Sequence, residues 1–347
     1  MQSPVQTFQR WRTLQTNHIH ALPIVILMPH SACNCKCVMC DIWKSNKNLK
    51  QLSEKDILPL ICSLKKFRTQ EIVMSGGEAL LNANFFSLCE ALKKIKVKIT
   101  LLSTGLTLAK HAEKIVEFTD NIIVSLDGDE AMHDSIRNIP GAYQKMKEGI
   151  QCIKKIAPTF PVTSRTVIHK LNFKTWENII NAAKELSLNQ VSFLPADISS
   201  HAFNREVLWD ENRQHEILPE QNDLHKLQQI TEEIITLFTE DIQRKFIAET
   251  ADKLRNIYFY YAAFYGLNPF PYKRCNAPWV SSVIEADGNV RPCFFHESFG
   301  NIHNLKFEEI INSKEAVAFR KSLNTQTNTT CVKCVCYLNL PVNKSLL

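Results

Sequence analysis

Four cysteines stand within eight positions near the start of the chain, in the stretch SACNCKCVMC, directly after the apolar run LPIVILM. Cys33, Cys37 and Cys40 have the spacing C-x3-C-x2-C. Three thiolates on one short loop suit a [4Fe–4S] cluster, which normally takes four. One iron would then keep an open position, and an open metal position implies chemistry there. The alternative is a zinc knot that includes Cys35 as the fourth ligand.

A second group of thiols lies near the end of the chain and comprises Cys275, Cys293, Cys331, Cys334 and Cys336. Between the first two lies the pair Asp287-Gly288, which is typical of a hairpin turn and would bring their thiols together. Cys331 and Cys334 form a C-x2-C pair. A zinc ribbon is the alternative to an iron–sulfur cluster on these four thiols. Cys336 could replace Cys334 as a ligand or be a spare thiol.

The composition indicates the setting in which these thiols work. The chain has 347 residues, of which 45% are hydrophobic and 12 are cysteines, and its net charge is +6. It lacks a secretory signal, so we expect a cytoplasmic protein whose cysteines bind metal or react and do not form disulfides. Without a dense basic block we expect no nucleic-acid partner, and without an apolar run of about 18 residues we expect no membrane span. Cys62, Cys89 and Cys152 lie in apolar contexts and are interpreted as small buried hydrophobic residues.

Short apolar runs alternate with amphipathic segments in the first half of the chain. The pattern predicts strands at 23–29, 71–75, 98–103, 121–126, 161–168 and 190–194, and helices at 53–67, 84–95, 108–118, 142–156 and 174–186. Ser53 and Asp56 form a capping box at the start of the first of these helices. Six β-then-α units predict the α/β class and a partial (β/α)6 TIM-like barrel, two units short of a full one. In such folds chemistry takes place at the C-terminal ends of the strands.

The pattern divides the chain into an N-terminal extension at 1–22 and a barrel core at 23–198. A helical linker that shapes the substrate site follows at 199–272, and a small metal-bound module at 273–347. The polar stretch FLPADISSHAFNRE begins where the barrel opens. His201, Asn204 and Arg205 are therefore candidates for substrate contacts.

The first cysteine loop, placed directly after the first strand, resembles the signature of the radical S-adenosylmethionine (SAM) enzymes. The stretch SGGEALL after the second strand resembles the glycine-glycine-glutamate motif of the same family. The resemblance implies that Cys33, Cys37 and Cys40 hold a [4Fe–4S] cluster whose free iron takes the amino and carboxylate groups of SAM. One electron then cleaves SAM and yields a 5′-deoxyadenosyl radical, which abstracts a substrate hydrogen. Cys35 is extra, and Met39 occupies a position where the family prefers an aromatic residue.

The same resemblance implies which residues contact SAM. Gly76 and Gly77 let the backbone approach the methionine end of SAM, and Glu78 accepts from its ammonium. The other candidates lie in the cysteine loop or at the ends of later strands, and are Met39, Ser103 with Thr104, Ser125, Arg137, and Leu194 with Pro195. The alternatives are an ordinary turn for Ser103, a helix cap for Ser125 and a solvated helix face for Arg137. We expect Asp127 and His133 to shape their turn and not to react.

The C-terminal cysteines resemble those of the twitch domain, the shortened form of the SPASM extension found in one branch of this family. The resemblance implies one auxiliary [4Fe–4S] cluster, without a second, on Cys275, Cys293, Cys331 and Cys334. Closed by four protein ligands, this cluster would accept or relay an electron. In sulfatase-maturating relatives an aspartate next to the second auxiliary-cluster cysteine is the base, whereas Phe294 stands there in this chain. His296 and Glu297 are candidates for proton transfer, with a surface pair as the alternative.

Three functions compete for this sequence. The first is a radical SAM oxidoreductase acting on a small sugar- or cyclitol-like molecule, as in the aminocyclitol dehydrogenase that shares the twitch pattern. The second is a maturase that modifies a peptide. Such maturases often carry a leader-binding domain before the cysteine loop, for which the 32 residues here are too few, although a separate recognition protein could supply it. The third is a non-catalytic iron–sulfur carrier, which needs no SAM motifs. An enzyme of this kind needs a reducing partner such as flavodoxin or ferredoxin.

Overall fold

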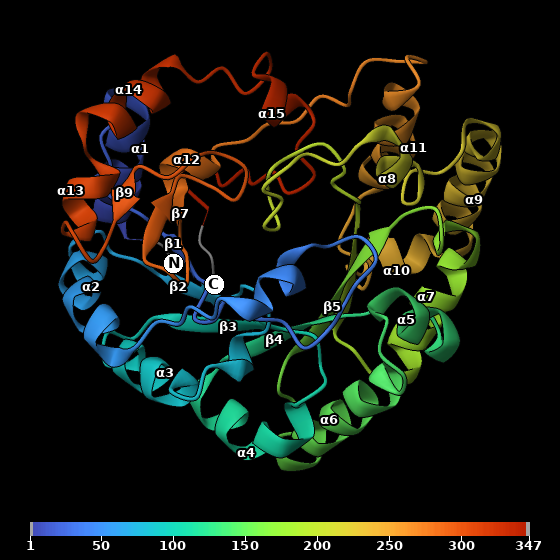
Figure 1. Ribbon diagram of the computed structural model, residues 1–347, viewed down its shortest axis with the longest axis horizontal. Coiled ribbons are helices and arrows are strands. Elements are labelled where there is room, and N and C mark those ends of the chain that lie inside the picture. The colour runs from blue at the N-terminus through green and yellow to red at the C-terminus, as the bar shows by residue number, and fades with distance from the viewer. Residues whose placement is uncertain (1–2, 345–347) are drawn as a thin grey trace.

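An arc of parallel strands with helices on its outside forms the body of the protein (Figure 1). The computed structural model describes residues 3–344. Six strands pair in parallel in the order β6-β5-β4-β3-β2-β1. They are β1 (Ile24–Leu27), β2 (Glu71–Met74), β3 (Lys98–Ser103), β4 (Asn121–Ser125), β5 (Val162–Ile168) and β6 (Gln190–Pro195). The predicted α/β fold with a partial barrel is confirmed.

The helices between these strands begin and end close to their predicted positions. They are α2 (Glu54–Lys66), α3 (Phe85–Lys93), α4 (Leu108–Phe118), α6 (Ala142–Ile156) and α7 (Trp176–Glu185). The predicted capping box starts α2, where the Asp56 carboxylate accepts from the Ser53 backbone N–H at 2.7 Å. The sequence pattern does not predict α1 (Pro4–Thr16) or α5 (Glu130–Arg137). α5 has only 8 residues, too few for its periodicity to stand out from the turn residues around it.

The strands are buried on the face toward the helices and partly open on the face toward the barrel axis. In β4, Ile122 and Val124 are fully buried, whereas Ile123 and Ser125 between them are half-buried. β5 shows the same alternation, and Arg165 on its inner face is exposed. A complete TIM barrel fills its interior with layers of bulky side chains. Here the interior is partly open, so the inner strand faces can line a site.

The segment after β6 covers the open edge of the barrel. It contains α8 (Glu211–His215), α9 (Leu224–Leu237), α10 (Thr239–Gln243) and α11 (Ala251–Phe264). α11 packs against α9 and β6, and a bridge between Val191 and Ile247 continues the sheet beyond β6. The Tyr261 hydroxyl on α11 donates to the Ile168 carbonyl at 2.5 Å and accepts from the Ala196 N–H at 2.8 Å. The segment is helical, as expected, and it is fastened to the barrel.

The C-terminal part joins the same sheet. β7 (Ser281–Ile284) pairs in parallel with β1, and β8 (Asn289–Arg291) and β9 (Gly300–Asn301) follow in antiparallel. The predicted hairpin at Asp287-Gly288 is confirmed, with Gly288 at φ +87°. The short helices of this part are α12 (Ala277–Val280), α13 (Phe307–Ile311), α14 (Lys314–Ser322) and α15 (Thr329–Val332). One sheet therefore runs through barrel and module, and the four residue boundaries drawn from the sequence stay predictions.

The tail beyond the last cysteine is seated at the N-terminal end of the barrel. Leu340 packs with Ile24 of β1 and Val280 of α12 in a small second core. Arg10 of α1 donates to backbone carbonyls in this tail, at 2.6 to 3.3 Å, on Leu340, Pro341 and Lys344. The N-terminal helix thus fastens the C-terminal tail.

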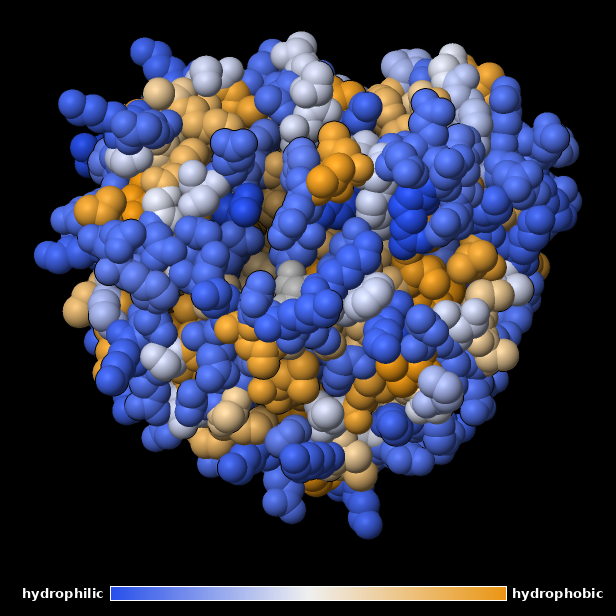
Figure 2. Space-filling view, viewed as in Figure 1, coloured by the Kyte–Doolittle hydropathy of each residue, from blue (hydrophilic) through white to orange (hydrophobic). Residues whose placement is uncertain are grey.

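The face seen in Figure 2 is mostly hydrophilic at its rim, with hydrophobic side chains in patches between polar ones. Within residues 3–344, no helix is long and apolar enough to cross a membrane. Cys89 is buried as expected, but Cys62 on α2 and Cys152 on α6 are exposed. The interpretation as buried hydrophobic residues is wrong for these two, because they lie on helix faces turned away from the sheet.

Candidate functional site

The first cysteine loop follows the C-terminal end of β1 and is fastened on two sides. The N–H groups of Lys36 and Val38 donate to carbonyls in the last turn of α5, each at 3.0 Å. The Asn46 side chain accepts from the Cys33 N–H at 3.0 Å and donates to the Cys33 carbonyl at 2.9 Å. These backbone contacts fix the loop relative to the strand ends.

The thiols of this loop influence one another's ionisation. Arg137 Nη1 donates to Cys37 Sγ at 3.3 Å. The hydrogen bond from the Cys35 thiol and the charge of Arg137 lower the pKa of Cys37 to about 6, against the effect of burial. Hydrogen bonds to Cys33 and Cys37 raise the pKa of Cys35, which makes Cys35 the donor of the group. Burial and the neighbouring thiols raise the pKa of Cys40 to about 12.

These thiols fit a cluster that needs thiolates on one short loop. Cys37 is biased toward the thiolate, whereas Cys40 would release its proton when metal binds. Within the described residues, no three His, Cys, Asp or Glu side chains are close enough together to hold a single metal ion. The assignment of Cys33, Cys37 and Cys40 as ligands stays a prediction, which the donor role of Cys35 supports.

Arg137 lies in the interior beside the loop. It is 7% exposed, and it pairs with the carboxylate of the fully buried Asp127. Burial raises the pKa of Asp127, while the charge of Arg137 and the Val167 N–H act in the opposite direction. A solvated helix face is therefore the wrong interpretation of Arg137. The helix cap proposed for Ser125 is wrong as well, because Asp129 is the N-cap of α5.

Asp127 and His133 shape the corner between β4 and α5, as expected. The Asp127 N–H donates to His133 Nδ1 at 3.2 Å, and Asp127 Oδ1 accepts from the Val167 N–H at 3.2 Å. Burial lowers the pKa of His133 to about 3, so the ring is neutral in the folded protein. A neutral ring can accept at Nδ1 only as the tautomer protonated on Nε2.

The glycine pair after β2 lies against the cysteine loop. A Cβ on Gly77 would stand 2.1 Å from the Ala32 carbonyl oxygen, and one on Gly76 would stand 2.9 Å from that of His30. Gly76 also has φ +115°, which residues with a side chain rarely adopt. Only glycine lets β2 and the loop approach this closely. The approach of the same backbone to SAM stays a prediction.

Glu78 is fully buried, and its carboxylate is used within the protein. It accepts from the Thr104 N–H and Oγ1 at 2.7 Å each, from Ser103 Oγ at 3.1 Å and from the Leu80 N–H at 3.2 Å. The Thr104 hydroxyl has one hydrogen and also lies 2.9 Å from Asn34 Oδ1. These contacts make Glu78 join the ends of β2 and β3, and its expected contact with the ammonium of SAM stays a prediction. The hydroxyls of Ser103 and Thr104 serve the same junction.

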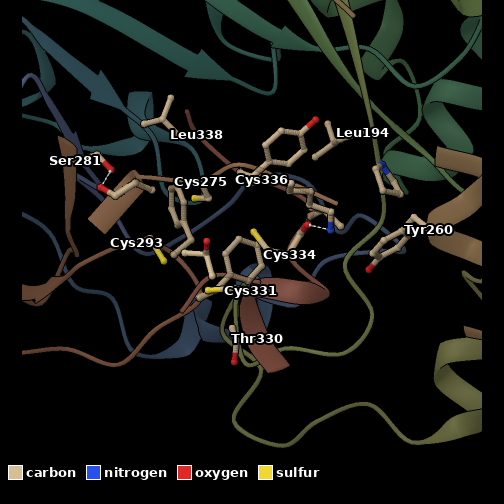
Figure 3. A pocket seen from close by; sticks show the side chains of 18 of the residues that line it. Leu194, Tyr260, Cys275, Ser281, Cys293, Thr330, Cys331, Cys334, Cys336 and Leu338 are labelled. Atoms are coloured by element: carbon tan, nitrogen blue, oxygen red, sulfur yellow. Dashed lines mark hydrogen bonds between the residues drawn. The ribbon is translucent and has the colours of Figure 1, made fainter. Parts of the chain in front are cut away.

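The C-terminal cysteines line one cavity of about 390 Å³. Figure 3 shows Cys275, Cys293, Cys331, Cys334 and Cys336 near the middle of the view, with Leu194 and Tyr260 to their right. Further walls come from the inner faces of β1, β5 and β6, through Ile26, Arg165 and Ser192. The cavity thus joins the predicted auxiliary site to the barrel interior.

The five C-terminal thiols influence one another's ionisation. Cys275 acts electrostatically on three of the others, which are Cys293, Cys331 and Cys334. Cys336 neighbours Cys334, but its own surroundings are the charges of Arg165, Asp197 and Lys273. Burial raises the pKa of Cys293 to about 12 and that of Cys331 to about 11, so metal binding would displace their protons. Cys334 and Cys336 both line the cavity, so the choice of Cys334 as the fourth ligand stays a prediction.

His296 and Glu297 are not a surface pair. His296 is half-buried, with Nε2 3.3 Å from Cys331 Sγ and its ring at 4.9 Å from that of Phe319. Burial lowers the pKa of His296. Glu297 is exposed, whereas His296 and Phe294 line the cavity. Of the two candidates for proton transfer, His296 is the one that faces the cavity.

The three candidates for substrate contact after β6 differ in their burial and in the contacts that their side chains make. The Arg205 guanidinium is buried and pairs with Asp197 at 2.5 Å, so it holds its own loop in place. His201 Nδ1 lies 3.0 Å from the Arg205 carbonyl, and the residue is exposed. Asn204 lines a second hollow of about 660 Å³ between the cysteine loop and the β7–β8 turn.

Met39 and Leu194 have different surroundings. Met39 is 9% exposed and belongs to the main hydrophobic core, whereas Leu194 lines the cavity of the C-terminal cysteines. Among the predicted site residues, Cys37 and Arg137 are hydrogen-bonded, and so are Glu78 and Ser103. Leu194 lies apart from both pairs, in the wall of the cavity. Sequence reasoning missed Arg165 and Tyr260 in the cavity. The charge inside the apolar strand PVTSRTVI was the available signal for Arg165.

Known protein families match the chain at both cysteine groups. Residues 27–183 match the radical SAM superfamily, and residues 275–335 match an iron–sulfur cluster-binding domain, SPASM. The chain is similar to pre-heme d1 synthase of Dinoroseobacter shibae, with 26% identity over 41% of this chain. It is also similar to the antilisterial bacteriocin subtilosin biosynthesis protein AlbA of Bacillus subtilis, with 23% identity over 81% of this chain. It spans only 37% and 57% of the lengths of these two relatives.

Solved structures show the same fold. SuiB of Streptococcus suis superposes with a TM-score of 0.66 at 16% identity, over 99% of this chain and 79% of that one. The enzyme anSMEcpe with bound AdoMet gives a TM-score of 0.65 at 17% identity, over 90% of this chain and 88% of that one. At the first cysteine group the chain therefore carries a domain that matches the radical SAM superfamily, and at the second it carries a domain that matches the SPASM iron–sulfur cluster-binding domain.

Proposed function

We propose that the protein oxidises a substrate inside the barrel and passes an electron from the substrate radical to an auxiliary [4Fe–4S] cluster. The radical SAM domain binds a [4Fe–4S] cluster and SAM, which together supply a 5′-deoxyadenosyl radical that removes a substrate hydrogen atom. Cys33, Cys37 and Cys40 hold the first cluster. Arg137, compensated by Asp127, stabilises the Cys37 thiolate in this arrangement.

The proposed SAM contacts are carried by the strand ends and the loop. They are Met39, Gly76, Gly77, Glu78, Ser103, Ser125, Arg137 and Leu194. Glu78 also fixes the ends of β2 and β3. The proposed auxiliary ligands are Cys275, Cys293, Cys331 and Cys334.

One observation carries the redox proposal: the five C-terminal cysteines share a cavity with the inner faces of β1, β5 and β6. The register pairs Ser125 of β4 with Arg165 of β5 and Arg165 with Ser192 of β6. Neighbouring strands lie about 5 Å apart, so Ser125 stands only two strands from Ser192 in the cavity wall. A substrate bound there would lie between the SAM site and the auxiliary site.

We favour a peptide as the substrate. Pre-heme d1 synthase and the AdoMet-dependent heme synthase of Methanosarcina barkeri match 41% and 45% of this chain, whereas the bacteriocin biosynthesis protein AlbA matches 81%. SuiB, solved with its precursor peptide, resembles this chain over 99% of its length with a TM-score of 0.65. The matches that cover most of this chain thus include a bacteriocin biosynthesis protein and a protein bound to a precursor peptide, which supports a peptide substrate. The sugar- or cyclitol-like substrate is the second candidate, and the match to a radical SAM domain argues against a carrier without SAM chemistry.

An electron donor must reduce the first cluster before SAM can be cleaved. We propose a small carrier such as flavodoxin or ferredoxin for this step. The cytoplasmic location expected from the sequence stays a prediction.

The substrate class is tested by following hydrogen into 5′-deoxyadenosine. An extract of cells grown in D₂O is divided into a peptide fraction and a small-molecule fraction, and each is incubated with the reconstituted, reduced protein and SAM. We expect 5′-deoxyadenosine heavier by one deuterium with the peptide fraction, because the radical takes its hydrogen from the substrate. Deuterium transfer from the small-molecule fraction alone would support the second candidate. The absence of 5′-deoxyadenosine under all conditions would refute the proposed function.

The redox role is tested with the double variant Cys331→Ala/Cys334→Ala. Two thiolates should not hold a [4Fe–4S] cluster, so the iron content should fall from about eight to about four per chain. We expect 5′-deoxyadenosine still to form, because the first cluster has its own ligands. The oxidised product should be lost, because the substrate radical has no acceptor for its electron. Normal formation of the oxidised product would show that the module is structural.

A further inference from the structure

Arg165 is a charged side chain on the inner face of the barrel. Its neighbours on β5, Ser164 and Thr166, are buried on the opposite face, while Arg165 lines the cavity of the C-terminal cysteines. Among the residues that the structure describes, its guanidinium makes no hydrogen bond or ion pair, and its charge acts on the carboxylate of Glu249, which lines the same cavity. Inner positions of barrel strands are usually filled by bulky apolar side chains. A charged side chain with free hydrogen-bond donors at such a position can bind a ligand.

Tyr260 of α11 brings a second polar group to the same cavity. It is 1% exposed, and its hydroxyl has no hydrogen-bond partner within the described part of the chain. A buried hydroxyl without a partner is unfavourable, so native proteins supply one. The next residue, Tyr261, shows the contrast, because its hydroxyl has two backbone partners.

The other charged groups of the cavity are engaged. Lys273 donates to the carbonyls of Val332 at 3.0 Å and Cys334 at 2.6 Å. Glu249 accepts from the Phe193 N–H at 3.0 Å. Lys253 lies over the ring of Tyr337, 5.8 Å from its centroid. Arg165 is therefore the charged group of this cavity that is left to meet a ligand, and Tyr260 is a residue of its wall whose hydroxyl has no hydrogen-bond partner within the described part of the chain.

We infer that Arg165 and Tyr260 form a substrate subsite that binds a carboxylate. The planar guanidinium can donate two parallel hydrogen bonds to the two carboxylate oxygens. The Tyr260 hydroxyl can donate to the same group or to a carbonyl beside it. The inference rests on the proposed function, since it names the part of the substrate that the cavity holds.

The register of the strands places this subsite between the two proposed cofactor sites. Arg165 pairs with Ser125, a proposed SAM contact, on one side. On its other side the cavity continues to Cys336, on whose thiol the charge of Arg165 acts. A substrate anchored by its carboxylate at Arg165 would present its neighbouring carbon atoms to the SAM site and to the auxiliary site.

Protection of Arg165 from phenylglyoxal, a reagent for arginine side chains, tests the inference. The anaerobically reconstituted holoenzyme with SAM is treated in the presence of N-acetylaspartic acid amide, N-acetylalanine, N-acetylasparagine amide or inorganic phosphate, and modification is followed by mass spectrometry. We expect a carboxylate probe to slow the modification of Arg165 by about tenfold, because a bidentate pair occupies the guanidinium. The neutral asparagine probe should give no protection. The control is Arg244 on the surface, whose modification should not change.

The outcomes separate the sources of the carboxylate. Protection by the aspartic acid probe indicates an acidic side chain, and protection by N-acetylalanine indicates the end of a peptide. Equal protection by the acidic and neutral probes, no protection, or protection by phosphate alone would overturn the inference. None of these outcomes requires turnover, so the proposed function is judged separately by the formation of 5′-deoxyadenosine.

Two neighbouring variants separate binding from folding. Tyr260→Phe removes a hydroxyl without partners, so we expect no loss of thermal stability and about fivefold weaker protection by the carboxylate probe. Tyr261→Phe removes a hydroxyl with two partners outside the cavity wall, so the stability should fall while the protection stays. Unchanged protection in Tyr260→Phe would remove Tyr260 from the subsite.

Discussion

Arg137 can approach the Cys37 sulfur because its charge is compensated inside the protein. Asp127 is fully buried and pairs with the same guanidinium, so the core holds a pair of opposite charges. Removing one partner of such a pair leaves an unpaired buried charge, which is strongly destabilising. The pair therefore commits β4 and α5 to one arrangement beside the cysteine loop. Because Arg137 also supplies a hydrogen bond to sulfur, this arrangement influences the thiolate that the cluster needs.

The thiols of Cys35 and Cys37 are expected to differ in function although they share a hydrogen bond. Cys37→Ala should abolish 5′-deoxyadenosine formation and lower the iron content by about four per chain, because it removes a ligand of the first cluster. Cys35→Ala should keep both, because this thiol is out of register and only donates to its neighbours. Iron analysis and chromatography of the SAM products measure the two effects. If both variants lost the same iron and activity, Cys35 would have to be a ligand.

At the scale of elements, β2 and the cysteine loop meet at Gly77. Gly77→Ala would place a methyl group 2.1 Å from a backbone oxygen that cannot turn aside, so the loop must move. We expect the first cluster to be lost, and the iron content to fall from about eight to about four per chain while the auxiliary cluster remains. The reduced protein should then show the electron paramagnetic resonance signal of the auxiliary cluster alone.

The matched control for this prediction is Gly266→Ala. Gly266 has open space around its Cβ position and φ +70°, so the change adds only backbone strain of about 1–2 kcal/mol. Its iron content should equal that of the unchanged protein. A full complement of iron in Gly77→Ala would mean that the loop accommodates the side chain. The close approach of β2 to the loop would then not be needed for the first cluster to bind.

The elements that sequence could predict are those defined by local pattern. The six barrel strands and their helices show the right periodicity within a few residues, and the capping box at Ser53 fixes the start of α2. The cysteine spacings likewise point to the two metal sites because cluster chemistry restricts them. The pairing of β7 with β1 has no local signal, since the two strands are far apart in the chain. The burial of Arg137 and the hydrogen bonds of Glu78 also depend on tertiary contacts, so the local sequence pattern could not predict these two environments.

At the scale of the whole molecule, the C-terminal module is part of the barrel. β7 extends the parallel sheet at β1, and the five C-terminal cysteines face the cavity that the inner strand faces complete. The tail then returns to the N-terminal end of the barrel, where Arg10 binds its carbonyls. The distance between SAM site and auxiliary site is therefore set by one continuous sheet.

This continuity predicts one cooperative unfolding transition. A background variant with Cys33, Cys37 and Cys40 changed to alanine carries only the auxiliary cluster, so its visible absorbance reports the module while circular dichroism reports the helices around the barrel. We expect both signals to be lost at the same denaturant concentration. In this background, Leu340→Ala should lower the free energy of unfolding by about 2–5 kcal/mol, because it empties a buried site shared by the tail, β1 and α12. Both midpoints should shift together.

Leu237→Ala is the control for the loss of a leucine, since Leu237 on α9 is 64% exposed and its removal leaves no buried cavity. Its midpoints should stay close to those of the background variant. If absorbance were lost at a lower denaturant concentration than circular dichroism, the module would unfold by itself, and the sheet shared by β1 and β7 would not couple the two parts. If Leu340→Ala moved the absorbance midpoint alone, the tail would stabilise only the module. Coincident shifts require that the tail, β1 and the auxiliary site unfold as one unit, which is the condition for a fixed distance between the two redox sites.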